Sequence, residues 1–160
     1  MRLLLAAIGR LKDGAEADLV ERYTMRFDGL GRGVGLGPLT IAELPESRAA
    51  SSALRKADEA KRLLDATRDA QIRIVLDEGG KALTSEAFAK WIGAKRDAGT
   101  KTLALLIGGA DGHGDDALAA ATLKLSLGSM TLPHGLARVI ITEQLYRTAT
   151  LLAGHPYHRS

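Results

Sequence analysis

Two glycine-containing stretches in the second half of the chain are the best candidates for a ligand site. Residues 102–107 (TLALLI) form a short apolar run, typical of a strand buried on both faces of a parallel sheet. The glycine-rich segment 108–114 (GGADGHG) follows, where backbone amides can lie against a ligand because glycine has no Cβ. A second apolar run, 125–132, is interrupted at Gly128. Ligands of open α/β sheets bind outside the carboxyl ends of strands, so we expect both stretches to face one crevice.

The charges around the glycine-rich segment indicate the kind of ligand. Residues 112–117 (GHGDDA) fit the pattern G-x-G-x-x-A of dinucleotide-binding folds, which makes a nicotinamide-dependent enzyme one hypothesis. However, Asp115 and Asp116 place negative charge at the helix start that would receive a pyrophosphate. The next strand also ends in TLPH (residues 131–134), without the acidic residue that would bind a ribose. A cofactor without phosphate groups fits better.

The histidines and the C-terminal segment are the remaining candidates for chemistry. None of the pairs among the four histidines has the i, i+4 spacing and nearby acid of a helical zinc site, so we predict no metal centre. We interpret His113 as a structural or surface residue. Residues 155–159 (HPYHR) concentrate donors and acceptors that suit an RNA base or phosphate.

The elements that would position these residues alternate between strand and helix. Apolar runs predict strands at residues 3–8, 39–44, 72–77, 102–107 and 125–132. Helical periodicity predicts helices that begin near Asp13, Arg48, Thr84, Asp115 and Leu136. This alternation predicts a single α/β domain over residues 1–160, with a mostly parallel sheet flanked by helices.

Local signals refine this outline. Asp13 and Glu16 resemble a capping box at the start of the first helix, and Thr84 is a candidate N-cap of a later one. The alternating glycines of segment 29–37 predict a mobile linker. The last helix carries an apolar stripe wider than one sheet face requires, which predicts an interface between two copies of the chain. The residues that widen the stripe are Leu136, Val139 and Ile140.

The composition excludes several classes of protein. Cysteine is absent, which rules out disulfides and thiolate metal sites. The apolar run at residues 3–8 fits a buried strand better than a signal peptide, and no stretch reaches membrane-spanning length, so we expect a cytoplasmic protein. The 22 Lys and Arg exceed the 19 Asp and Glu only slightly, which permits an RNA partner without requiring one. Arg48, Arg55 and Arg62 recur every seven residues, as either a salt-bridged helix face or a contact with RNA phosphates.

Four short motifs of the C-terminal half stand out, at residues 105–109 (LLIGG), 131–134 (TLPH), 143–147 (EQLYR) and 155–159 (HPYHR). Together they resemble the ribosomal RNA large subunit methyltransferase H family, small SPOUT-class enzymes that methylate N3 of a pseudouridine in bacterial 23S rRNA. Residues 76–78 (LDE) and 83–88 (LTSEAF) extend the resemblance to nearly the whole chain. The chain differs from the usual family pattern at Ala110-Asp111, where Pro-Glu is common, and at Gly135.

This resemblance implies a SPOUT-type fold with a C-terminal trefoil knot, a homodimer, and 23S rRNA within the ribosome as substrate. It implies S-adenosylmethionine as the cofactor, which agrees with the expectation of a ligand without phosphate groups. The residues that the family pattern assigns to the cofactor are Leu76, Gly108, Leu127, Gly128, Ser129, Met130, Thr131 and Leu132.

The resemblance also implies roles in the reaction. Tyr157 or His158 would orient or deprotonate the base, and Arg159 would stabilise the developing imide anion with its positive charge. The residues implied as RNA contacts are His134, Arg138 and His155. Two other hypotheses stay open, a non-catalytic RNA-binding module that retains the crevice and the nicotinamide-dependent enzyme. Binding of S-adenosylmethionine separates them from the methyltransferase.

Overall fold

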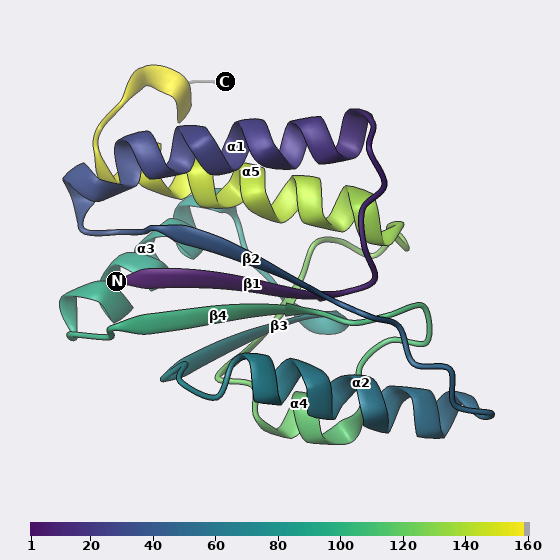
Figure 1. The fold of residues 1–160 in the computed structure, drawn as a ribbon. Coiled ribbons are helices and arrows are strands. Elements are labelled where there is room, and N and C mark those ends of the chain that lie inside the picture. The colour runs from purple at the N-terminus through teal and green to yellow at the C-terminus, as the bar shows by residue number, and fades with distance from the viewer. Residues whose placement is uncertain (159–160) are drawn as a thin grey trace.

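The computed structural model describes residues 1–158, and within them five strands form one parallel sheet between two layers of helices (Figure 1). The strands are β1 (Arg2–Ile8), β2 (Leu39–Leu44), β3 (Ile72–Ala82), β4 (Thr102–Ile107) and β5 (Leu123–Ser126). Every neighbouring pair is parallel, and the order across the sheet is β2-β1-β4-β3-β5. The predicted α/β fold with a parallel sheet is therefore confirmed.

The helices divide between the two faces of the sheet. One face is covered by α1 (Ala15–Gly31), α3 (Ser85–Asp97) and α5 (His134–Leu152), and the other by α2 (Ser52–Ala66) and α4 (Asp115–Ala119) (Figure 1). Two short 3₁₀ helices complete the described chain, η1 (Arg32–Val34) after α1 and η2 (Pro156–His158) after α5. In Figure 1, α5 lies beside α1 and η2 lies near the end of α5.

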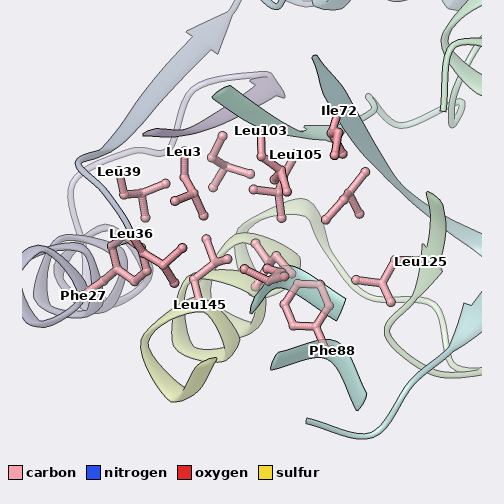
Figure 2. Close-up of a cluster of buried hydrophobic side chains, with 14 of the residues drawn as sticks. Leu3, Phe27, Leu36, Leu39, Ile72, Phe88, Leu103, Leu105, Leu125 and Leu145 are labelled. Carbon is pink, nitrogen blue, oxygen red and sulfur yellow. The ribbon is translucent and has the colours of Figure 1, made fainter. Parts of the chain in front are cut away.

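Alternate residues of the central strands build the two halves of the core. Leucines of β1 and β4, such as Leu3, Leu103 and Leu105, point from the sheet toward the helices of one face (Figure 2). There they pack in one cluster with helix residues, among them Phe27, Phe88 and Leu145. The intervening residues Ala6, Ile8 and Leu106 pack on the opposite face against Leu63 of α2. Because both faces are buried, β1 and β4 are almost entirely apolar, as expected for inner strands of a parallel sheet.

The structure corrects the expected boundaries at the second half of the sheet. β5 is only the four residues Leu123–Ser126, and residues 127–133 form a loop instead of continuing the strand. Gly128 adopts φ +134°, which is outside the range of a regular strand and ends the apolar run as a strand. Conversely, β3 extends to Ala82, past its expected end at residue 77, because it pairs again with β5 after a register shift. Helix α4 begins at Asp115, as expected, and ends after five residues at Ala119.

Two other local expectations are wrong and one is confirmed. The N-cap of α1 is Gly14, without a side-chain hydrogen bond, so Asp13 and Glu16 form no capping box. Segment 29–37 is the end of α1 followed by η1 and a packed turn, and not a linker, since Leu36 is buried. Thr84 is the N-cap of α3, where its Oγ1 accepts a hydrogen bond from the Ala87 amide at 3.1 Å.

Candidate active site

A cleft of about 740 Å³ lies outside the carboxyl ends of β3 and β4. Its walls come from the glycine-rich segment 108–114, the loop 127–133 and the first turn of α5. The crevice expected from the two glycine-containing stretches is therefore present. Of the eight residues assigned to the cofactor by resemblance, the cleft is lined by Leu76, Gly108, Leu127, Gly128, Met130, Thr131 and Leu132, whereas Ser129 is not among the lining residues.

Helix α2 holds the glycine-rich segment in place through close packing. A Cβ at Gly109 would lie 2.5 Å from Oε2 of the buried Glu59, and a Cβ at Gly114 would lie 2.5 Å from the carbonyl oxygen of Lys56. Real Cβ atoms do not approach oxygen this closely. At Gly114 the obstacle is backbone, so only glycine fits; at Gly109 a Cβ would require the buried Glu59 carboxylate, which accepts a hydrogen bond from the Ser47 amide, to move. The two glycines therefore fix the back wall of the cleft against α2.

An ion pair joins the same helix to the middle of the segment. The Arg55 guanidinium donates to both carboxylate oxygens of Asp111, at 2.6 Å and 3.2 Å. This hydrogen-bonded pair lowers the pKa of Asp111 and raises that of Arg55. Arg62 is also paired, with Asp58 at 2.6 Å. The salt-bridge interpretation of the arginine series is therefore confirmed for Arg55 and Arg62.

The imidazole of His113 is buried between the ends of β3 and β4. Its Nε2 lies 3.1 Å from the Gly108 amide nitrogen and 3.0 Å from the Leu76 carbonyl oxygen. Burial is the main reason that its pKa is lowered, so the ring is uncharged at neutral pH. With 6% of its surface exposed, His113 is a structural residue, as expected, and it also lines the cleft.

The geometry around α4 disfavours a dinucleotide. The segment that matched G-x-G-x-x-A leads into a helix of only five residues, with exposed Asp115 and Asp116 in its first turn. Gly114, the N-cap of α4, packs against α2 at the point where a pyrophosphate would have to approach. A phosphate at this helix start would meet both steric obstruction and negative charge.

Helix α5 begins in the cleft but buries one residue that was expected to contact RNA. His134 lines the cleft. Arg138 is only 1% exposed, because its guanidinium donates to Glu43 at 2.7 Å and to the carbonyl oxygens of Ile8 and Gly9, both at 2.8 Å. These contacts make Arg138 an anchor between α5 and the ends of β1 and β2. In the described chain it has no exposed group for an RNA contact, contrary to expectation.

Packing explains why residue 135 is a glycine. A Cβ at this position would overlap the carboxylate of Glu16, which reaches across from α1. The first turn of α5 therefore sits directly on an acidic side chain, a favourable arrangement because the amides of that turn have no partners within the helix.

The tail folds back onto the middle of α5. The Tyr157 hydroxyl donates to Glu143 at 3.2 Å, and the Tyr157 ring lies 4.6 Å from the Tyr146 ring and 5.1 Å from the Arg147 guanidinium carbon. Burial and the negative Glu143 raise the pKa of Tyr157 to about 12. His155 is exposed. Arg159 and the side chain of His158, two of the residues with predicted catalytic roles, lie outside the described residues.

Within the described residues, the part of the tail that packs on α5 lies away from the cleft. Tyr157 packs on Glu143 and Tyr146, which follow His134 by nine and twelve residues in α5. At 1.5 Å per helical residue, this places the two regions roughly 14–18 Å apart along the helix. Figure 1 shows the tail at one end of α5 and the loop before α5 at the other.

Comparison with known proteins identifies the family. A family model described as a predicted SPOUT methyltransferase matches residues 1–158. The chain belongs to this family. The methyltransferase is 52% identical over 160 residues to the ribosomal RNA large subunit methyltransferase H of Brucella anthropi, covering 100% of both chains. It is 50% identical over 159 residues to the protein of the same name from Methylobacterium nodulans, covering 99% of this chain and 98% of that one.

The fold is shared with a solved structure of low sequence similarity. A probable methylase family protein from Haemophilus influenzae Rd KW20 superposes with a TM-score of 0.54 at 12% identity, covering 98% of this chain and 69% of that one. The trefoil knot implied by the family stays a prediction. In the described part of the methyltransferase, no helix is long and apolar enough to cross a membrane, and no cluster of three or more His, Asp or Glu side chains could hold a metal ion.

The contribution of α2 to the site was not predicted. The sequence gives no reason to single out Glu59 or Lys56, yet Glu59 packs against Gly109 and Lys56 lines the cleft. Arg55 was noticed for its spacing alone, because its partner Asp111 is 56 residues away in the sequence. The one available signal was Asp111 itself, which lies in the glycine-rich segment and needs a cation when it is partly buried.

Proposed function

We propose that this methyltransferase transfers a methyl group from S-adenosylmethionine to N3 of a pseudouridine in bacterial 23S rRNA. The proposal extends to the site of action, the assembled ribosome in the cytoplasm, and to a homodimer as the active form. The observation that carries it is the cleft, where residues of the glycine-rich segment and of the TLPH segment face one another at the strand ends. Relatives that are about half identical to this chain over their whole length carry the corresponding name.

The residues of the cleft fit S-adenosylmethionine. Its walls are largely aliphatic side chains and glycine backbone, which suits an uncharged adenosine group, while Asp77 and Glu78 provide negative charge for a cationic sulfonium. S-adenosylmethionine would supply an electrophilic methyl group. The residues expected to hold it are Leu76, Gly108 and the loop residues 127–132.

Methylation of N3 requires that the imide nitrogen loses its proton. A general base needs a pKa near the working pH, whereas the pKa of Tyr157 is about 12 in the described chain. Tyr157 therefore keeps its proton at neutral pH and acts as a hydrogen-bond donor that orients the base. Charge stabilisation by Arg159 and participation of His158 remain part of the proposal on the strength of the sequence resemblance.

The separation of cleft and tail supports a homodimer. If the tail contacts the substrate base, we expect it to reach the cleft of another copy, because Tyr157 packs on Glu143 and Tyr146, roughly 14–18 Å along α5 from the start of its own cleft. Exposed apolar side chains flank the cleft, with Met130 exposed by 82% and Leu136 by 42%. A second copy that covers them would bury apolar surface and bring its tail toward the cleft.

The decisive test is transfer of a labelled methyl group to ribosomal substrates. The enzyme should label 23S rRNA in assembled ribosomes much faster than free 23S rRNA, and nucleoside analysis should identify N3-methylpseudouridine. Because an N3 methyl group blocks base pairing, reverse transcription should stop at the modified position. Binding of ribosomes without methyl transfer would support the non-catalytic module, and a different methylated nucleoside would refute the proposed specificity.

A further inference from the structure

His113 is the one histidine of the glycine-rich segment, and its ring cannot satisfy all of its neighbours. A neutral imidazole carries one hydrogen, on either Nδ1 or Nε2. If Nε2 has no hydrogen, it accepts from the Gly108 amide but leaves the Leu76 carbonyl without a donor from the ring. If Nε2 carries the hydrogen, it donates to Leu76 and no longer accepts from Gly108. One strand end is therefore under-satisfied in each tautomer.

The second ring nitrogen has no partner either. Nδ1 of His113 is buried and makes no hydrogen bond with any described residue, although the ring lines the cleft. A buried polar atom without a partner is unfavourable, because the hydrogen bond that it makes to water in the unfolded chain is not replaced in the folded protein. A hydroxyl or amino group of a ligand in the cleft would satisfy this atom and would also select one tautomer.

We propose that His113 is a positioning residue for the methyl donor. Its uncharged imidazole fixes the Gly108 amide and the Leu76 carbonyl, the two backbone groups at the ends of β4 and β3, and its Nδ1 offers a polar contact to the bound molecule. The inference deepens the proposed function and rests on S-adenosylmethionine as the ligand.

The neutral state of the ring predicts a pH dependence of cofactor affinity. Protonation would place a second ring hydrogen against the Gly108 amide and a charge among buried groups. Since the pKa of His113 lies below the ordinary value of 6.5, its contributions to stability and to cofactor affinity are fully present above that pH and are lost as pH falls through the lowered pKa. The charged or titratable groups that face the same cleft are Lys56, Asp77, Glu78, Asp111 and His134.

Two substitutions separate the role of the ring from that of its charge. In His113→Gln, the side-chain amide can donate to Leu76 and accept from Gly108 without titrating, but it does not replace the Nδ1 contact to the ligand. Cofactor affinity at pH 8 should therefore lie between those of the wild type and His113→Phe, and it should be independent of pH. In His113→Phe the ring shape stays but both nitrogens are lost, so affinity should fall roughly tenfold at every pH. His134→Gln is the matched control, since His134 lines the same cleft and should not be responsible for the acid loss.

The experiment is calorimetric titration of the full chain with S-adenosylmethionine and S-adenosylhomocysteine between pH 5 and 8. We expect the wild type and His134→Gln to lose affinity for both ligands toward pH 5, whereas His113→Gln keeps it. Normal binding by His113→Phe, or an acid loss that disappears in His134→Gln, would overturn the inference while leaving the proposed function intact. Failure of the wild type to bind either ligand at pH 8 would overturn both.

Discussion

The two ends of α5 are built in different ways. At the cleft end, the glycine-rich segment lies against Glu59, Lys56 and Arg55 of α2, and its backbone is fixed by packing within one chain. At the tail end, Tyr157 rests on the helix surface through one hydrogen bond and contacts with Tyr146 and Arg147. The difference is consistent with our proposal that each chain holds its own cofactor site, whereas the substrate side is completed by a second copy and by RNA.

Deletion of residues 155–160 is the strongest test of this division. Cofactor affinity should change by less than a few-fold, because none of the described residues that line the cleft belongs to the tail. Methyl transfer to ribosomes should fall by roughly a hundredfold or more, the range expected for lost orienting or acid–base groups. Calorimetry and single-turnover assays measure the two quantities. A parallel loss of binding and turnover would mean that the tail only stabilises α5.

The proposed homodimer predicts that two differently inactivated subunits restore activity when they are mixed. The tail-deleted subunit should regain activity when mixed with a subunit whose cleft is blocked, since one heterodimer combines an intact cleft with an intact tail. Random exchange should restore about a quarter of wild-type activity, because half of the dimers are mixed and each has one complete site. Sedimentation should show dimers throughout. Absence of any recovery would place the tail and the cleft of one chain in the same site.

A substitution at Gly109 tests how α2 holds the glycine-rich segment, and a large effect is expected for Gly109→Ala. The new Cβ would meet Oε2 of Glu59 at 2.5 Å, so the segment has to move away from α2 and distort the cleft. Overpacking of this kind destabilises by about 1–3 kcal/mol, and cofactor affinity should fall about tenfold or more. The double variant Gly109→Ala with Glu59→Ala should recover part of both losses, because the obstructing carboxylate is gone. Strictly additive losses would show that Glu59 does not limit this position.

The features that could be predicted, the inner strands and the ligand-binding strand ends, are encoded in short segments of sequence. Apolar runs such as residues 102–107 indicate strands wherever they occur, and glycines after such a run indicate a ligand-binding strand end. Residues 127–132 were misread because the same apolar pattern also fits a loop that packs on the core, as Leu127 does. Buried polar contacts between distant segments were out of reach. Arg138 and Glu43 are 95 residues apart, and nothing in either segment indicates the partner.

Substitution of Gly128 distinguishes two explanations for its role in the cleft. We expect Gly128→Val to abolish cofactor binding, either because the side chain occupies the ligand's space or because the backbone is strained. The φ of +134° disfavours every L-residue, and a Cβ would meet no heavy atom within 4 Å. If strain dominates, Gly128→Ala should also lose roughly tenfold in affinity, since such a conformation costs about 1–2 kcal/mol. Near-normal binding by the alanine variant would assign the effect of valine to its bulk.

The smallest expected effect concerns the ion pair between α2 and the glycine-rich segment. Arg55 and Asp111 retain 32% and 26% side-chain exposure, so solvent screens their attraction and the net contribution to stability should be small. However, the pair determines where Asp111 lies in the cleft wall. Asp111→Asn should therefore lower cofactor affinity roughly two- to fivefold while changing thermal stability little.

The pair between Arg62 and Asp58 is a matched control for this last prediction. It lies on the same helix, has the same 2.6 Å distance and similar exposure, and its arginine donates to the Pro45 carbonyl, which is not among the residues that line the cleft. Asp58→Asn should therefore leave cofactor affinity unchanged. Arg55→Gln should resemble Asp111→Asn, and the double variant should be no worse than either single one, because both remove the same contact. An equal loss of affinity in Asp58→Asn would show that α2 affects the cleft only through general helix stability. The packing around Gly109 would then hold the glycine-rich segment less firmly than the structure indicates.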